Sequence, residues 1–291
     1  MTAAIALQLG RVSNLPTIWS NVLAGTVLAG GQPWRPATLL VMLAVSLLYV
    51  GGMYLNDAFD REIDARERPS RPIPAGLVAA NTVFAAGFGM LLAGITVAMM
   101  AAVITGPDAV WRPVLASVAL AGAIVFYDWN HKGSALSPFY MGLCRVLAYL
   151  TAGYAAVATP AVALFAAALI SLCYLIGLTY IAKQEAHDRI GNLWPLLFLA
   201  APIVYAVTQI THAPVAVSVV AAALVVWILQ ALSYLRRRGP GDVPRAVVSL
   251  IAGISLVDAL FLASAGALLA AAAAIGCFIA TLLTQRWVSG T

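Results

Sequence analysis

Residues 56–76 read NDAFDREIDARERPSRPIPAG, and this stretch decides how the rest of the chain is interpreted. It directly follows residues 38–55, an apolar run long enough to cross most of a bilayer. Only 9% of the whole chain is charged, yet this stretch holds four acids within eight residues. Charged groups at membrane depth are costly unless they are used, so the stretch predicts a functional site.

The spacing of the oxygen-bearing side chains points to a metal site. Asn56, Asp60 and Asp64 are four residues apart, so on a helix they share one face. Carboxylate and amide oxygens suit Mg²⁺, whose coordination is completed by water and phosphate. Arg68 and Arg71 follow and can bind phosphate oxygens in a forked geometry. We therefore predict a magnesium–diphosphate site, although a simple charged cap on a membrane helix is the alternative.

The same stretch resembles a known family signature. The pattern NDxxDxxxD followed by RPxRPIPxG is similar to the first signature of the UbiA superfamily of membrane prenyltransferases. The residues of this motif most resemble those of the branches that include chlorophyll synthase and digeranylgeranylglyceryl phosphate synthase. The resemblance implies an all-α, polytopic transmembrane helix bundle, two Mg²⁺ ions bridged by a diphosphate, a prenyl diphosphate donor and a lipophilic acceptor. It also implies a role in isoprenoid biosynthesis.

The composition independently indicates a multi-pass membrane protein. The chain has 291 residues, is 63% hydrophobic and has a mean hydropathy of +0.95. We expect one domain, residues 1–291, with nine or ten transmembrane helices, because the superfamily usually has nine. Residues 246–288 could form two crossings, or one long tilted helix with an interfacial segment. The apolar segments lie near residues 15–31, 37–57, 80–104, 113–130, 137–157, 160–182, 194–212, 214–235, 246–266 and 267–287.

The distribution of basic residues predicts the orientation in the membrane. With the N-terminus in the cytoplasm and ten crossings, 14 of the 16 Lys and Arg residues lie on or near the cytoplasmic side. Only Arg35 and Arg112 lie on the opposite side. The polar stretches after the second, fourth and sixth segments then share the cytoplasmic face, where we expect the active site. Basic patches with interleaved aromatic residues do not occur, so a nucleic-acid partner is not expected.

A second acidic stretch follows the sixth apolar segment. Residues 183–189 read KQEAHDR, and Asp188 with Gly191 resembles the end of the superfamily's second aspartate-rich motif. Gln184 stands where the first aspartate of that motif is expected. The resemblance implies a second Mg²⁺ on Asp188, with Gln184 or Glu185 completing the site. A solvated charged helix end is the alternative reading.

The stretch after the fourth segment adds a cation. Lys132 follows Tyr127 by five residues, which resembles a superfamily segment whose lysine contacts the diphosphate. Asp128 lies one helical turn before Lys132 and could pair with it. His131 could act as a general base or could be a solvated loop residue.

Polar residues within the other segments are candidates for inward-facing groups. Arg11 and Asn14 resemble the superfamily's opening of the first helix, where polar side chains reach the pocket. An anchoring arginine followed by a helix cap explains them equally well. Arg145 and Asp258 lie inside apolar runs, where ionisable groups are expected to face the bundle interior and to pair.

Taken with the resemblance, these residues imply Mg²⁺-dependent transfer of a prenyl group to a lipophilic acceptor inside the bilayer. The prenyl length and the acceptor are not set by the sequence. A non-catalytic family member that binds isoprenoid lipid or aids assembly is an alternative, supported by Gln184; a membrane transporter fits less well, because the charges gather at one face. The predicted site comprises the catalytic residues Asp60, Asp188 and Lys132, the diphosphate-binding residues Arg68, Arg71, Lys132 and Arg11, and the metal ligands Asn56, Asp60, Asp64, Gln184, Glu185 and Asp188.

Overall fold

The computed structural model describes residues 1–106, 110–184, 192–211, 213–237, 239–288 and 290, and these contain twelve α-helices. The predicted all-α class is therefore confirmed, whereas the predicted number of nine or ten helices is wrong. Ten helical elements coincide with the ten apolar segments, and the two additional helices are seven-residue elements, too short to cross a bilayer. The elements are α1 (Ala3–Leu9), η1 (Val12–Asn14), α2 (Leu15–Leu28), α3 (Pro36–Phe59), α4 (Arg61–Glu67), α5 (Ala80–Thr105), α6 (Trp111–Asn130), α7 (Ser137–Ala156), α8 (Val162–Ala182), η4 (Trp194–Ala200), α9 (Ala201–Gln209), α10 (Pro214–Arg237), α11 (Asp242–Ser264) and α12 (Leu268–Thr284).

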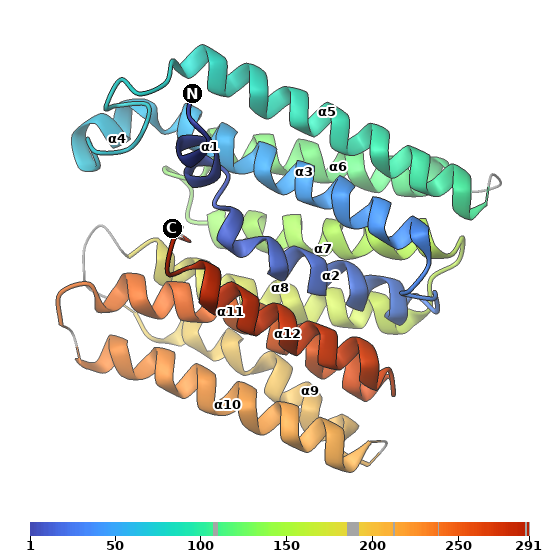
Figure 1. Ribbon diagram of the computed structural model, residues 1–291. Coiled ribbons are helices and arrows are strands. Elements are labelled where there is room, and N and C mark those ends of the chain that lie inside the picture. Colours follow the sequence, from blue (N-terminus) through green and yellow to red (C-terminus); the bar gives the residue numbers. More distant parts are fainter. Residues whose placement is uncertain (107–109, 185–191, 212, 238, 289, 291) are drawn as a thin grey trace.

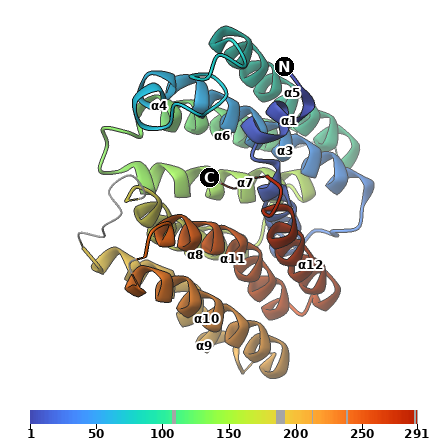
Figure 2. The same cartoon turned by 60° about the vertical axis from the view of Figure 1, so that its left-hand side comes forward.

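Six of the described helices are long and apolar enough to cross a membrane, namely α3, α5, α6, α8, α10 and α11. The apolar α12 and the combined η4–α9 element are shorter. The long helices lie side by side, and successive ones run in opposite directions (Figure 1). Both chain ends and α4 lie at the same end of the bundle in Figure 1, and in the view turned by 60° α4 and the N-terminus both lie in the upper part (Figure 2).

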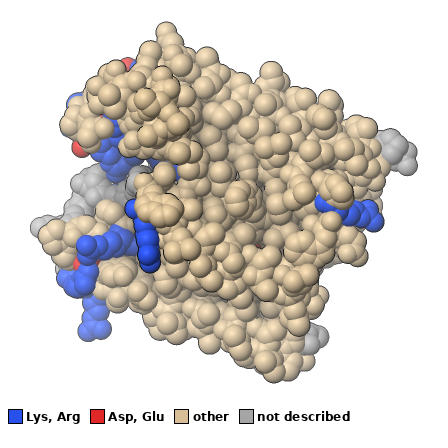
Figure 3. Space-filling view, in the orientation of Figure 1, with Lys and Arg blue, Asp and Glu red and all other residues tan. Residues whose placement is uncertain are grey.

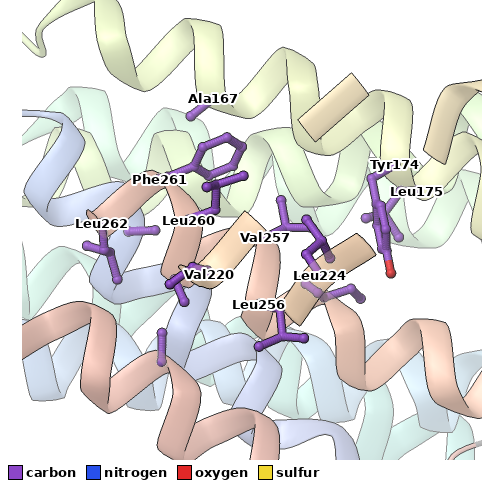
Figure 4. Packing of buried hydrophobic residues seen from close by; sticks show 14 of the residues in the cluster. Ala167, Tyr174, Leu175, Val220, Leu224, Leu256, Val257, Leu260, Phe261 and Leu262 are labelled. Carbon is purple, nitrogen blue, oxygen red and sulfur yellow. The ribbon is translucent and has the colours of Figure 1, made fainter. Parts of the chain in front are cut away.

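Helix α11 forms the centre of the bundle. It packs against α2, α8, α10 and α12, and 83% of its apolar window is buried. Its residues Val257, Leu260 and Phe261 contact a shell that includes Tyr174 of α8 and Leu224 of α10 (Figure 4). Lipid tails are as apolar as these side chains, so close packing must stabilise the bundle in the membrane.

Helices α3 and α5 approach each other through glycine. A Cβ atom at Gly51 would lie 2.8 Å from the carbonyl oxygen of Gly87, and a Cβ at Gly87 would lie 2.8 Å from Leu55. Only glycine allows two helix backbones to come so close. This contact fixes the position of α3, the helix that ends at the candidate site.

The C-terminal apolar run forms two helices, because the chain turns at Gly266. Gly266 has φ +71°, in the left-handed region that glycine adopts without strain. The Ala267 N–H donates to the Leu262 carbonyl and the Gly266 N–H donates to the Ala263 carbonyl, as in a Schellman helix ending. The single long helix considered for residues 246–288 is therefore absent, and the second part of this run forms a separate helix, α12, which is shorter than the membrane-capable helices.

Basic side chains gather at the end of the bundle that carries α4 and the C-terminus (Figure 3). A smaller basic patch is visible at the opposite end (Figure 3), where Arg35 and Arg112 begin α3 and α6. This arrangement agrees with the uneven distribution of Lys and Arg counted from the sequence. The loops that were predicted to share one side of the membrane lie at one end of the bundle.

We expect labelling of single cysteines to assign the basic end to the cytoplasm. In a background without Cys144, Cys173 and Cys277, cysteines at Ser70 and Gly133 should react with an impermeant maleimide only from the cytoplasmic side. A cysteine at Gly106, at the opposite end, should react only from the other side. A Cβ at Gly133 or Gly106 has open space around it, so these changes disturb no packing. Labelling of Ser70→Cys and Gly106→Cys from the same side would contradict this topology.

Candidate functional site

The candidate site begins where α3 ends. The Asp60 N–H donates to the Asn56 carbonyl and the Asp64 N–H donates to the Asp60 carbonyl, so the i to i+4 pattern continues across the junction into α4. The side chains of Asn56, Asp60 and Asp64 are all buried, with 7%, 4% and 2% of each residue exposed. Three oxygen-bearing groups are therefore held inside the protein at the end of a membrane helix, as the spacing predicts.

Asp60 lies against two basic residues from the segment after α6. Its Oδ2 is 3.3 Å from Lys132 Nζ and 3.4 Å from His131 Nε2. Burial alone would raise the pKa of Asp60, but the hydrogen bond from His131 and the charges of His131 and Lys132 outweigh it and lower the pKa below its ordinary value. Asp60 is thus a carboxylate at neutral pH. The pairing considered between Lys132 and Asp128 is not observed, because Lys132 reaches Asp60 instead.

Two arginines bind the other two aspartates of the stretch. Arg71 Nη1 lies 2.8 Å from Asp64 Oδ2 and 3.1 Å from Asp57 Oδ1, and so joins α4 to the end of α3. Arg11 Nη2 lies 3.1 Å from the same Asp57 oxygen and 3.4 Å from Asn56 Oδ1. The predicted phosphate-binding residues Arg11 and Arg71 therefore meet at Asp57, which sequence reasoning did not assign to the site.

Arg11 has an unusual backbone conformation. Its φ is 41°, and among the described residues it is the only non-glycine residue with positive φ. This left-handed conformation costs an L-residue about 1 kcal/mol or more. Arg11 joins α1 to η1 and also donates hydrogen bonds to the site. The strained backbone is therefore at the residue whose own side chain reaches the site.

Asp128 of α6 completes the buried polar cluster. Asn56 Nδ2 donates to Asp128 Oδ1 over 3.1 Å. Asp128 is only 3% exposed, and its Oδ2 has no hydrogen-bond partner among the described residues. Most buried carboxyl oxygens in proteins are hydrogen-bonded, so this atom requires an explanation. Sequence reasoning gave Asp128 no role, and its place one turn before Lys132 was the only signal that could have suggested one.

The second predicted metal motif is described only at its beginning. Lys183 and Gln184 follow α8, whereas Glu185 and Asp188 lie outside the described residues. Lys183 Nζ donates to the Ser134 carbonyl over 2.7 Å, which attaches the end of α8 to the loop after α6. Because Lys132 lies in the same loop, this contact places the start of the second motif on the side of the first site.

The described donors fit Mg²⁺ in their chemistry. Within the described ranges, no three His, Cys, Asp or Glu side chains stand close enough together to hold a metal ion. The amide of Asn56, however, lies against Asp128, and Asp60 follows it one turn later, so an amide and two carboxylates are available. Hard oxygen ligands of this kind, with an unpartnered carboxyl oxygen among them, are what Mg²⁺ takes.

A second buried polar cluster lies deeper in the bundle around Asp258 of α11, which is fully buried. Its carboxylate accepts hydrogen bonds from Ser20 of α2, over 2.6 Å, and from Tyr149 of α7. Arg145, one turn before Tyr149, donates to the Thr17 carbonyl over 3.1 Å. The inward orientation predicted for Asp258 is confirmed, but the described ion pairs include none between Arg145 and Asp258. Ser20 and Tyr149 bind Asp258 instead, and they were not predicted as its partners.

Comparison with known proteins identifies relatives of the chain. The model of the UbiA prenyltransferase family matches residues 16–245. Digeranylgeranylglyceryl phosphate synthase from Methanopyrus kandleri is 30% identical over 187 residues, 64% of each chain. The Thermococcus kodakarensis protein of that name is 31% identical over 177 residues, which is 60% of this chain and 58% of the relative. Chloroplastic chlorophyll synthase from Oryza sativa subsp. japonica is 31% identical over 131 residues, 43% of this chain and 34% of the relative. The chain thus matches less than two thirds of these relatives' lengths.

Solved structures share the fold at lower identity. A structure of digeranylgeranylglyceryl phosphate synthase in membranes matches with a TM-score of 0.60 and 18% identity, covering 90% of this chain and 97% of that chain. The apo structure of a UbiA homologue from Aeropyrum pernix K1 matches with a TM-score of 0.63 and 18% identity, covering 84% and 96%. These similarities establish the fold.

Proposed function

The chain belongs to the UbiA prenyltransferase family, and from this we propose that it transfers a prenyl group from an isoprenyl diphosphate to a lipophilic acceptor inside the membrane. It is a multi-pass integral membrane protein. Residues 1–291 act as one domain in this proposal, with the active site at the cytoplasmic side. The observation that carries the proposal is the buried group of Asn56, Asp57, Asp60 and Asp64 surrounded by basic side chains at one end of the bundle.

The basic residues bind the diphosphate of the donor in this proposal. Lys132 and Arg71 pair with Asp60 and Asp64, and the Lys132 side chain is 41% exposed. It can therefore turn from Asp60 towards a phosphate oxygen. Arg11, which contacts Asp57, and Arg68, which follows α4, lie at the same end of the bundle as these residues. An arginine side chain can bind phosphate through two parallel N–H groups.

In this proposal, bound metal ions assist the departure of the diphosphate, and exclusion of water protects the prenyl group until it is transferred. We assign one metal to Asn56 and Asp60, with Asp64 nearby, and a second to Asp188 with Gln184 or Glu185. When bound, two Mg²⁺ ions would neutralise the departing diphosphate and lower the barrier to breaking the allylic C–O bond. The apolar bundle next to the site keeps water from the cationic prenyl group, so that the acceptor attacks it instead.

A product assay tests the proposed function. Purified protein, Mg²⁺ and a series of prenyl diphosphates of different length are incubated with a lipid extract of the host membrane, and new prenylated lipids are identified by mass spectrometry. The proposal predicts a product whose mass equals that of an extract component plus one prenyl group. It also predicts that chelation of Mg²⁺ prevents this product. Absence of any such product across the prenyl series would contradict it.

Gln184 gives a specific prediction for the second metal. A glutamine oxygen can coordinate Mg²⁺ but brings no charge. Gln184→Asp should therefore lower the Mg²⁺ concentration for half-maximal rate by about tenfold, the effect of ~1.4 kcal/mol. Glu185→Gln should change this concentration little, because a helix through this stretch would place Gln184, four residues before Asp188, on the same face as Asp188. The opposite pattern would assign Glu185 as the ligand, and unchanged titrations in both variants would contradict a metal at this motif.

A further inference from the structure

We propose that Asp128 is an additional metal ligand, and that α6 thereby supplies the negative charge that Gln184 does not bring. The inference rests on the proposed function, because it concerns the same metal–diphosphate site. It extends that site from the two aspartate-rich stretches to a third helix.

The first argument is the unpartnered carboxyl oxygen. Asp128 Oδ1 accepts a hydrogen bond from Asn56, but Asp128 Oδ2 is buried without a partner among the described residues. A buried carboxylate oxygen without a partner is unfavourable, whereas a bound cation removes the penalty. The nearest basic side chains are engaged elsewhere, since Lys132 pairs with Asp60 and Arg11 pairs with Asp57.

The second argument is the position of Asp128 beside both donors assigned to the first metal. It contacts Asn56 directly over 3.1 Å. One turn later in the same segment, His131 and Lys132 contact Asp60. Asp128 therefore lies at the same end of α6 as the residues that contact Asp60. Its contact with Asn56 uses Nδ2, whereas Asn56 Oδ1, the amide atom able to bind a metal, accepts only a long contact of 3.4 Å from Arg11 among the described residues.

The third argument is the charge of the whole site. Mg²⁺ sites in proteins use carboxylates together with substrate phosphate, and ligand charge strongly affects affinity. Gln184 leaves the second motif one carboxylate short of the pattern in its family. Lys183, the residue before Gln184, donates to the Ser134 carbonyl in the loop after α6, so the end of α8 contacts the loop that follows the helix of Asp128.

Binding of Mn²⁺, a paramagnetic substitute for Mg²⁺, tests this assignment without an activity assay. Wild-type protein is titrated with Mn²⁺ in the presence of inorganic pyrophosphate, and free Mn²⁺ is measured by electron paramagnetic resonance. Asp128→Asn keeps the shape of the side chain and an oxygen for the Asn56 contact, so it removes the charge while leaving Asn56 in place. We expect at least tenfold weaker Mn²⁺ binding, and substantial recovery in the double variant with Gln184→Asp.

The control is Glu62→Gln, which removes one negative charge from an exposed side chain of α4. It should bind Mn²⁺ like the wild-type protein. Wild-type affinity in Asp128→Asn would overturn the inference while leaving the proposed function intact. Absence of Mn²⁺ binding by the wild-type protein would instead contradict the metal site of the proposed function.

A second variant tests direct coordination even if Asp128→Asn does not fold. Asp128→Cys, in a background without the native cysteines, offers a thiolate that prefers soft metals. With Cd²⁺ and pyrophosphate, this variant should show the ultraviolet absorption of a cadmium–thiolate bond, and the cysteine-free parent should not. A folded Asp128→Cys protein without that absorption would overturn the assignment.

Discussion

Replacing Asp60 by asparagine is expected to reduce turnover by about a hundredfold or more, while the protein remains folded. The carboxylate is 4% exposed, and its lowered pKa keeps it charged at neutral pH. Loss of one charged ligand weakens the metal that stabilises the departing diphosphate, and electrostatic groups of this kind contribute about 10² to 10³ in rate. The fold should tolerate asparagine, because it has the same size and Lys132 is partly solvated. Steady-state kinetics with the donor and acceptor identified by the product assay measures the effect.

Glu62→Gln is the matched control for Asp60→Asn. It makes the same chemical change two residues away, on a side chain that is 77% exposed and contacts only Arg61 among the described ion pairs. Turnover should stay within about twofold of the wild-type value, as for a surface substitution. If Asp60→Asn retained more than a tenth of the activity, a barrier change below ~1.4 kcal/mol, the metal assignment would be wrong.

Replacing Asp258 by alanine is expected to destabilise the bundle by about 3 kcal/mol, since it leaves two buried hydroxyl groups on other helices without their acceptor. Asp258 accepts hydrogen bonds from Ser20 of α2 and from Tyr149 of α7. The alanine variant leaves both hydroxyl groups without that partner in an apolar bundle. Thermal unfolding in detergent, followed by size-exclusion chromatography, measures the loss.

Ser117→Ala separates this effect from the general removal of a buried polar group. Ser117 is fully buried in α6, but its hydroxyl donates only to the Val114 carbonyl of its own helix. Its removal should change stability by less than about 1 kcal/mol. Equal thermal stability of Asp258→Ala and Ser117→Ala would show that the Asp258 cluster does not hold α2, α7 and α11 together.

The sequence was sufficient to predict the long helices and the burial of the oxygen-bearing face at the end of α3, because both produce strong local patterns. Apolar runs located the ten segments that form the main helical elements, and the four-residue spacing of Asn56, Asp60 and Asp64 predicted their common burial. Basic side chains gather at one end of the bundle, as expected for alternating helices that return their loops to the same side.

Contacts between distant segments could not be predicted in the same way. Asp128 meets Asn56 across 72 residues, and Asp258 meets Tyr149 across 109, so no local spacing reports either contact. The pairing of Lys132 with Asp60 depends on how the ends of α6 and α3 pack, whereas helical spacing alone favoured Asp128. Short helices such as α1 and α4 were missed because seven residues leave too weak a periodic signal.

Release of inorganic pyrophosphate from a prenyl diphosphate tests the central claim most directly. Purified protein is incubated with geranylgeranyl diphosphate and the acceptor fraction, with Mg²⁺ or with a chelator, and pyrophosphate is quantified by a coupled assay. We expect release that requires Mg²⁺ and falls to background in Asp60→Asn. A lipid-binding or transport protein would leave the diphosphate intact. Absence of Mg²⁺-dependent pyrophosphate release by folded wild-type protein, across prenyl diphosphates of different length, would contradict the account.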